Sequence, residues 1–361
     1  MPIAFHFHTM ADGRELIYVD DADTTLSSER RADERTLEPR PETATMRRDV
    51  LTGEWVSIVP TRQHRVMLPG EEANPLVPQT RDNPSEIPDN YDVVVFENRS
   101  PSFGPALGDI DHENLKLGFG QSGPAHGRCE VVCFSPNPTG ALATHSVSRV
   151  RTVIEAWAQR TEALSALPGI EQVFVFENRG VEIGVTLHHP HGQIYAYPFV
   201  TPRTQRLLDS ISRMGPSFFA DLVEFEQSSQ RVVAQGEHFV AYVPFAARWP
   251  LEVHLVPRRH VPDLAGLSEE ERDELAVMYR QLLGTFDALY DTPTPYIAAW
   301  HQAPVRHSRD QVRLMLQITS PRRGKTALKY LAGSESAMGA FVGDVLPEAQ
   351  AQRFRDALVS P

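Results

Sequence analysis

The chain has 361 residues, of which 41% are hydrophobic and 23% are charged, a composition typical of globular proteins. Acidic residues number 47 against 35 Lys and Arg, so the formal net charge is -12. This charge disfavours nucleic acid and anionic membranes as main partners, and an anionic substrate would need a local group of basic residues. The length fits two ordinary domains or one large core made of two similar halves.

The compartment can also be predicted from the sequence. No apolar run is long enough to span a membrane, and the N-terminal residues lack the basic and apolar segments of a secretory signal. Cys129 and Cys133 lie four positions apart in a strand-like run, which places them about 13 Å apart on one face. That separation is too long for a disulfide, so we expect two reduced core cysteines in a cytoplasmic protein.

The N-terminal third of the chain contains little regular pattern. Residues 1–48 are densely charged and have few large apolar residues after Tyr18, which predicts a partly extended arm. The ordered core is predicted to begin with the alternating apolar run at residues 51–60. Residues 67–92 are rich in proline and polar residues and are predicted to form a long surface loop.

The rest of the chain shows the same order of elements twice. Strands, then an amphipathic helix, then strands are predicted in each half, with Ser268 as the N-cap of the second helix. The predicted strands are residues 91–98, 129–136, 171–180, 191–198, 239–245, 251–257, 295–304 and 312–321, and the helices are 148–167 and 267–290. This order predicts an α+β fold with mainly antiparallel strands, divided into halves at residues 49–205 and 206–361.

The strongest chemical signal is the run His189-Pro190-His191-Gly192-Gln193. If this run is extended, His189, His191 and Gln193 share one face. Pro190 cannot donate to a strand ladder, which indicates an edge or an irregular strand start. Gly192 would leave no side chain beside His191, so that a bulky phosphate could approach the backbone.

A histidine in this setting can act as a nucleophile. Imidazole is largely neutral at cellular pH and can attack phosphorus, and the phosphoramidate splits one transfer into two displacements. Gln193 could donate an amide hydrogen to a non-bridging phosphate oxygen. Three histidines in four positions could instead bind a metal or lie on an exposed edge. The polar, glycine-containing residues 176–186 just upstream favour phosphate binding.

Together these motifs resemble the galactose-1-phosphate uridylyltransferase family, a branch of the histidine-triad superfamily. The resemblance rests on residues 176–180, 184–187 and 189–198, and further blocks follow the family's order from about residue 10 to 350. It implies two histidine-triad-like halves, the first carrying the nucleophile and the second contributing to the sugar site. It also implies a homodimer.

The resemblance implies a two-step reaction. His191 would attack the α-phosphate of UDP-glucose, release glucose 1-phosphate and pass UMP from a uridylyl-histidine to galactose 1-phosphate. Gln193 and His189 would assist it. The implied substrate-binding residues are Arg62, Arg65, Asn98, Asn178, Thr186, Lys329, Gly333, Ser334 and Glu335. Without the resemblance, Arg62, Arg65 and Lys329 would be interpreted as solvated surface charges.

The chain departs from the family at its metal sites. Where many members place zinc ligands, this sequence has Asn74, Val77 and Pro138, and only His189 is retained. The second family site is reduced to His301, because its paired positions are Met315 and Gln317. One histidine cannot complete a tetrahedral zinc site, so we expect no tightly bound metal.

Two other functions remain open from the sequence. The changed loop near residues 70–80 and Phe341, where some members have glutamine, leave the base and the hexose undetermined. A phosphorylase or hydrolase of ADP-sugars or dinucleoside polyphosphates could use the same His191. A non-catalytic nucleotide-binding protein is the third possibility, and the intact nucleophile motif argues against it.

Overall fold

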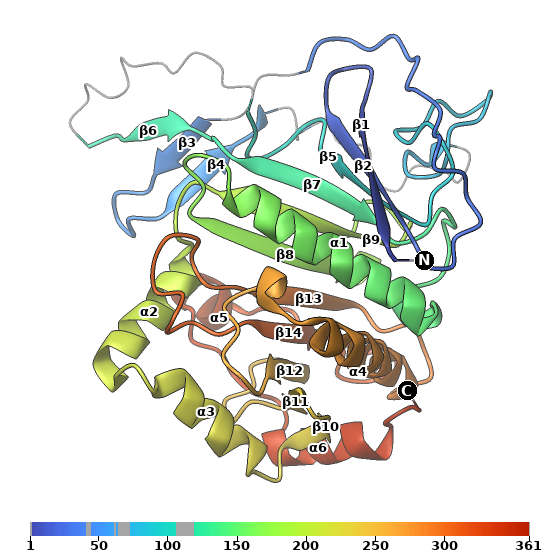
Figure 1. Cartoon of the computed structure of the whole chain (residues 1–361). Helices are drawn as coiled ribbons and strands as arrows, with labels where there is room; N and C mark the ends of the chain where they lie inside the picture. The colour runs from blue at the N-terminus through green and yellow to red at the C-terminus, as the bar shows by residue number, and fades with distance from the viewer. Residues whose placement is uncertain (1, 41–44, 61–62, 64–72, 106–118, 361) are drawn as a thin grey trace.

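One antiparallel sheet runs through the whole molecule. The computed structural model describes residues 2–40, 45–60, 63, 73–105 and 119–360. Within them, eleven strands form the sheet in the order β1-β2-β5-β7-β9-β8-β13-β14-β12-β11-β10, and a small sheet has the order β4-β3-β6 (Figure 1). None of the helices in these ranges combines the length and apolar character needed to cross a membrane.

The strands and helices have the following bounds. The strands are β1 Ala4–Thr9, β2 Glu15–Asp20, β3 Thr45–Arg48, β4 Trp55–Ile58, β5 Val93–Glu97, β6 Ser122–Pro124, β7 Arg128–Cys133, β8 Gln172–Arg179, β9 His191–Tyr197, β10 Val232–Gln235, β11 Phe239–Tyr242, β12 Leu251–Pro257, β13 Tyr296–His301 and β14 Met315–Ser320. The α-helices are α1 Val147–Ser165, α2 Pro202–Met214, α3 Phe218–Gln227, α4 Glu269–Ala288, α5 Gly333–Met338 and α6 Pro347–Asp356.

The two halves of the large sheet repeat the same arrangement. The first half runs β5, β7, α1, β8, β9, and the second runs β11, β12, α4, β13, β14. The strand pairings repeat as well: β7 pairs antiparallel with β9 in the first half, and β12 pairs antiparallel with β14 in the second. The strand order is therefore mirrored about the junction of β8 with β13. The predicted α+β fold of two mainly antiparallel halves is confirmed.

Both long helices, α1 and α4, have a serine as their N-cap residue. The Ser146 hydroxyl accepts the backbone N–H of Arg149 at the start of α1. At the start of α4, Ser268 and Glu271 cap each other reciprocally, as predicted for Ser268. Such caps satisfy N–H groups that have no partner within the helix, and acidic residues in the first turn of α4 suit the helix dipole.

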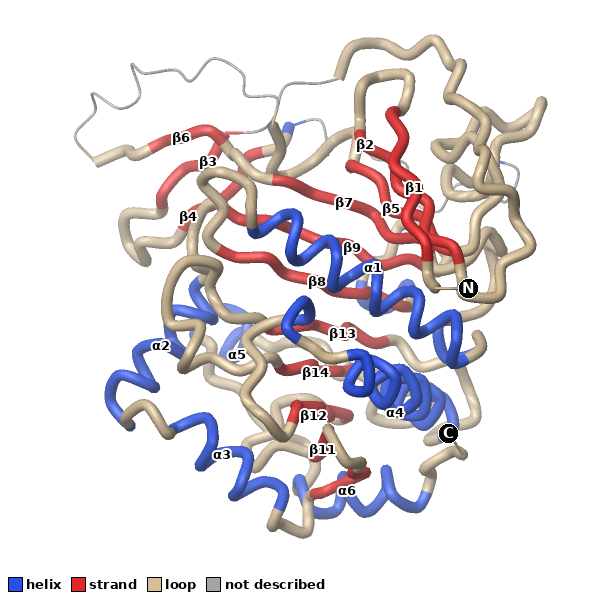
Figure 2. The backbone as a smooth tube through the Cα atoms, viewed as in Figure 1, coloured by secondary structure: helices blue, strands red, loops and turns tan. Residues whose placement is uncertain are grey.

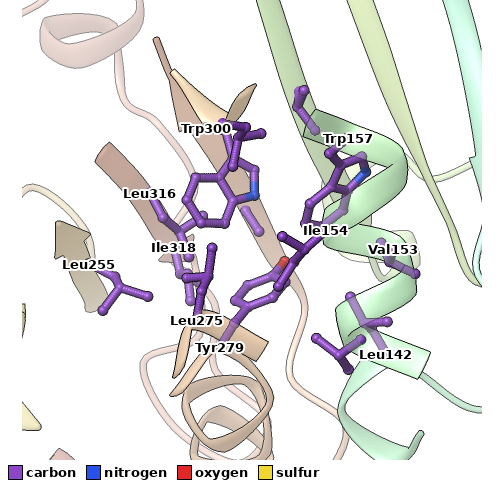
Figure 3. Packing of buried hydrophobic residues seen from close by; sticks show 14 of the residues in the cluster. Leu142, Val153, Ile154, Trp157, Leu255, Leu275, Tyr279, Trp300, Leu316 and Ile318 are labelled. Carbon is purple, nitrogen blue, oxygen red and sulfur yellow. The ribbon is translucent and has the colours of Figure 1, made fainter. Parts of the chain in front are cut away.

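A shared aromatic core joins the halves on one face of the sheet. Trp157 from α1, Tyr279 from α4 and Trp300 from β13 converge there (Figure 3), with ring centroids 5.9–6.1 Å apart. All three side chains are at most 1% exposed and belong to one continuous cluster. Since each large aromatic buries roughly 150–250 Å², this contact binds the two halves into a single core.

The opposite face of the sheet is covered at its two ends. Figure 2 shows strands and long loops around the first half, and helices α2 and α3 beside the second. Tyr91 and Leu76 pack on β5 and β7 at the first end, and Phe219 and Val223 pack on β11 and β12 at the other. The strands β9, β8 and β13 lie between these covers.

The N-terminal residues differ from the prediction. Instead of a loose arm, β1 and β2 form a hairpin that joins the main sheet next to β5. Tyr18 and Val19 are fully buried, and Gly13 turns the chain with a φ of 81°. The apolar residues of β2 drive this burial, which the charged sequence after them obscured. Residues 21–40 do lack helix and strand, and ion pairs such as Arg35–Asp33 at 2.8 Å hold them.

A buried carboxyl lies on the helix-covered side of β8. The Glu177 side chain accepts hydrogen bonds from Tyr296 at 2.9 Å and Tyr279 at 3.4 Å. Burial raises its pKa from 4.5 to about 7, although the two hydroxyls and Arg179 oppose the shift. The Glu177 carboxyl ionises at lower pH in the unfolded chain than in the folded protein. Its contribution to the free energy of unfolding is therefore lost as the pH rises from 4.5 through 7.

We therefore expect Glu177→Gln to stabilise the protein at pH 8, by up to about 3 kcal/mol for a shift of this size. The amide keeps an acceptor for Tyr296 and carries no charge to bury. At about pH 3.5 the gain should nearly vanish, because Glu177 is then mostly protonated in both the folded and the unfolded wild type. Urea unfolding at the two pH values measures this, with the exposed Glu162→Gln as control. An equal effect at both pH values would contradict the assignment.

Candidate active site

Strand β9 presents the predicted nucleophile on the face opposite α1. Ile194 and Ala196 are buried in the shared core, and His191 and Gln193 alternate with them and are partly exposed. Phe176 of β8 lies directly across from Gln193. Because Gly192 pairs with Glu177, Asn178 occupies the position beside His191 on the same face. The structure thus brings together three of the predicted site residues.

The loop before β9 depends on one glycine. Gly180 has a φ of 102°, and a Cβ there would lie 2.7 Å from Cβ of Pro295. Any other residue would be strained and would also clash. The glycine that ends the run at residues 176–180 is therefore required by the backbone, which turns there towards Thr186 and the histidines.

Gly192 has a different role from the one predicted. A Cβ at this position would lie 3.1 Å from Cζ of Phe134 and 3.1 Å from the carbonyl oxygen of Phe176. Gly192 alternates with His191 along the strand, so a side chain there would point away from the imidazole and into the core. The prediction that Gly192 clears space for a phosphate was wrong. Close packing against Phe134 explains the glycine.

The ring of His191 is oriented by a backbone carbonyl. Its Nδ1 lies 2.6 Å from the carbonyl oxygen of His189 and donates to it, which leaves the lone pair on Nε2. Burial lowers the pKa of His191 below 6.5, although the hydrogen bond to His189 opposes the shift. A neutral imidazole with a free Nε2 is the form that can attack phosphorus.

His189 lies outside the strand and faces inward. Strand β9 begins at His191, so His189 does not extend the row formed by His191 and Gln193. Its side chain is 2% exposed, and burial lowers its pKa to about 4. Nε2 donates to the Ser135 carbonyl at 2.7 Å, and Nδ1 accepts from Asn74 Nδ2 at 3.2 Å. Both ring nitrogens are therefore engaged by the protein.

The residues around His189 do not fit a zinc ion. Val77 and Pro138 have no side-chain ligand, and an amide N–H of Asn74 points at the nitrogen that would bind the metal. Within the described ranges, no three or more His, Cys, Asp and Glu residues form a group that could hold a metal. The prediction of no tightly bound metal stays a prediction.

The second retained histidine also has an amide as its partner. His301 Nε2 donates to Gln317 Oε1 at 3.2 Å, and Gln317 Nε2 donates to Glu252 Oε1 at 2.7 Å. His254 donates to the same Glu252 oxygen at 3.0 Å. These hydrogen bonds hold the pKa of Glu252 at about 2, against the effect of burial. Gln317 separates His301 from Glu252 in this chain, and among the described residues no three or more His, Cys, Asp and Glu form a group that could hold a metal.

The predicted sugar-site residues at the C-terminal end are tied to one another. Lys329 Nζ pairs with Glu335 Oε1 at 2.8 Å, and both side chains are at most 5% exposed. The ammonium also donates to the carbonyls of Arg248 and Val342. This pairing holds the pKa of Glu335 at about 2. In this structure the two charges compensate each other inside the chain.

The remaining predicted residues lie in different parts of the chain. Gly333 and Ser334 begin the short helix α5 and are exposed. Asn98 follows β5, and its side chain accepts the backbone N–H of Ser100 at 2.9 Å. Arg62 and Arg65 lie outside the described residues. Tyr91 and Ser135, which contact His189, were not among the predicted residues; the sequence signal for Tyr91 was an aromatic residue at the end of a polar, proline-rich segment.

Comparison with known proteins identifies the family of this chain. Residues 31–201 match the model of the galactose-1-phosphate uridyl transferase N-terminal domain, and residues 205–359 match that of the C-terminal domain. The chain is 42% identical to the galactose-1-phosphate uridylyltransferase of Streptomyces lividans, over 96% of each chain. It is 33% identical to that of Thermotoga maritima, over 87% of this chain and 98% of the relative.

Solved structures show the same fold. A uridylyltransferase structure superposes with a TM-score of 0.76 at 30% identity, covering 87% of this chain and 98% of that one. An ADP-glucose phosphorylase from Arabidopsis thaliana superposes with a TM-score of 0.63 at 24% identity, which shows a shared fold. Both domains and the near full-length relatives agree, so this chain belongs to the galactose-1-phosphate uridylyltransferase family.

Proposed function

We propose that this protein transfers UMP from UDP-glucose to galactose 1-phosphate through a uridylyl-His191 intermediate. The observation that carries the proposal is the hydrogen bond from His191 Nδ1 to the His189 carbonyl, because it leaves Nε2 as the reactive nitrogen. The family membership supplies the substrates, since its relatives carry the name of this activity.

Each half of the reaction forms one bond and breaks one. In the first, His191 Nε2 attacks the α-phosphorus, an N–P bond forms, and the P–O bond to glucose 1-phosphate breaks. The imidazole keeps its Nδ1 proton, and the His189 carbonyl stabilises the developing positive charge. In the second, a phosphate oxygen of galactose 1-phosphate attacks the same phosphorus, and the N–P bond breaks. Gln193 lies on the same face and can donate to a non-bridging oxygen.

Other roles belong to the same proposal. Asn178 neighbours His191 and is assigned to the phosphates together with Thr186. Lys329 and Glu335 would serve the hexose, which requires their ion pair to open or to bind substrate as a unit. Arg62, Arg65, Asn98, Gly333 and Ser334 keep the substrate-binding roles implied by the family. A homodimer and a cytoplasmic location are likewise proposed from the family.

The covalent intermediate can be tested by intact mass. Incubation with UDP-glucose should add one uridylyl group to the wild type, and galactose 1-phosphate should remove it. His191→Ala should abolish the adduct, whereas His188→Ala, at the exposed neighbouring histidine, should retain it. An adduct from ADP-glucose but not from UDP-glucose would replace the proposed donor. No adduct with either donor would overturn covalent catalysis on these substrates.

The first half-reaction should be insensitive to pH through the ordinary histidine range. Burial lowers the pKa of His191 below 6.5, so the imidazole stays neutral at pH 6.5 and above. The single-turnover rate with UDP-glucose, whose diphosphate does not titrate in this range, should stay level from about pH 8 to about pH 6.5 and fall below that. A midpoint at or above 6.5 would mean that His191 is not the titrating nucleophile.

Activity should also be independent of zinc. The partners of His189 and His301 are amides and carbonyls rather than metal ligands. We expect far less than one zinc per chain in the purified protein, and no change in kcat after dialysis against a chelator. Elemental analysis and activity assays measure the two quantities. One zinc per chain whose removal lowers kcat would refute this prediction.

A further inference from the structure

We propose that Asn74 is a positioning residue that acts through His189 on the nucleophile His191, at a site where the family resemblance implies a zinc ion in many members. The inference rests on the proposed function. Asn74 does not hydrogen-bond to the imidazole of His191; it bonds to His189, whose carbonyl bonds to His191. Its evidence is the set of hydrogen bonds around His189.

The amide of Asn74 has a defined orientation. Its Oδ1 accepts the backbone N–H of Leu76 at 2.9 Å, which places Nδ2 towards His189. Nδ2 lies 3.2 Å from His189 Nδ1 and donates to it. The backbone carbonyl of Asn74 in turn accepts from Asn83 Nδ2 at 2.9 Å. The amide is therefore set by its own loop before it meets the histidine.

The other edge of the His189 ring is held as well. Nε2 donates to the Ser135 carbonyl at 2.7 Å and lies 3.2 Å from the hydroxyl oxygen of Tyr91. Tyr91 donates to the Leu76 carbonyl at 2.6 Å, so the same loop contacts both edges of the ring. With an acceptor at Nε2 and a donor at Nδ1, one neutral tautomer satisfies every contact.

This clamp extends to the nucleophile through the backbone. The carbonyl of His189 accepts the Nδ1 proton of His191 at 2.6 Å and so sets the direction of Nε2. The next residue is Pro190, which has no N–H to anchor that peptide. The side chain of His189 is therefore a main anchor of the carbonyl that orients His191. A rotation of this peptide would move the nucleophile away from in-line attack.

Metal binding is incompatible with this arrangement. A zinc ligand needs a ring nitrogen with a free lone pair, and here one nitrogen accepts a proton donor while the other carries a proton. A cavity of about 350 Å³ adjoins the pair and is lined by Asn74, His189, Leu187 and Pro138, among others. The lining includes three of the positions where many family members place zinc ligands, namely Asn74, Pro138 and His189, and only His189 has a side chain that usually binds zinc.

The test compares Asn74→Leu with Ser85→Ala. Leucine keeps the approximate size of asparagine and cannot donate to His189. Ser85 donates to the Val77 carbonyl at 2.5 Å in the same loop and does not contact His189, so its variant is the matched control. We expect Asn74→Leu to slow uridylylation and the return transfer by the same factor, about tenfold to a hundredfold. The Kd for UDP should be unchanged, and Ser85→Ala should keep both rates.

The outcomes separate positioning from a structural role. Rates of Asn74→Leu within twofold of the wild type, or an equal loss in Ser85→Ala, would overturn the proposal. If Asn74→Leu does not fold, nitrogen NMR of the wild type decides: His189 should be the Nε2–H tautomer and His191 the Nδ1–H tautomer. Any other pair of tautomers would overturn it. A wild type that forms no adduct with UDP-glucose would refute the proposed function instead, and the tautomers would still test the clamp.

Discussion

The hydrogen bond from His191 Nδ1 to the His189 carbonyl is the contact on which the rest of this site depends. It leaves Nε2 as the ring nitrogen of His191 that carries the lone pair, and it forms where β9 begins at His191 and His189 lies in the preceding loop. Gly180 allows the turn that leads into this loop, and the contacts of His189 hold its end. The shared core under β8 and β9 then supplies a rigid support for a side chain that must be oriented within a few tenths of an ångström.

The two halves of the sheet differ at the strand that carries the candidate nucleophile. In the second half β14 takes the place of β9, and its residues facing away from the shared core include Met315 and Gln317 but no histidine. Helices α2 and α3 cover that end of the sheet, and Met315 packs under Phe219 and Val223. One half thus carries the candidate nucleophile on this strand, while the corresponding strand of the other half carries no histidine. The duplicated fold provides two places for a site and uses one.

Both retained family histidines have a primary amide as partner, Asn74 for His189 and Gln317 for His301. A structural zinc can contribute on the order of 10–16 kcal/mol to folding of a small domain, whereas one hydrogen bond contributes about 1 kcal/mol. The amides therefore cannot replace a metal in stability. The loop at residues 74–91 must be held mainly by its packing, where Leu76, Ile87 and Tyr91 are at most 3% exposed. The Asn74 amide instead orients the ring of His189.

The sequence by itself determined the central strands and the two long helices, and it identified His191 as the candidate nucleophile. The strands of both halves, the cap at Ser268 and the exposure of His191 with Gln193 follow from periods and caps, which are local properties of the chain. Only the tertiary structure decided the burial of the N-terminal hairpin, the packing reason for Gly192 and the clamp on His189. Asn74 and His189 are 115 residues apart, and no local pattern encodes a contact at that separation. Periodicity specifies which side of a strand faces inward, whereas the neighbour found there depends on how the whole chain folds.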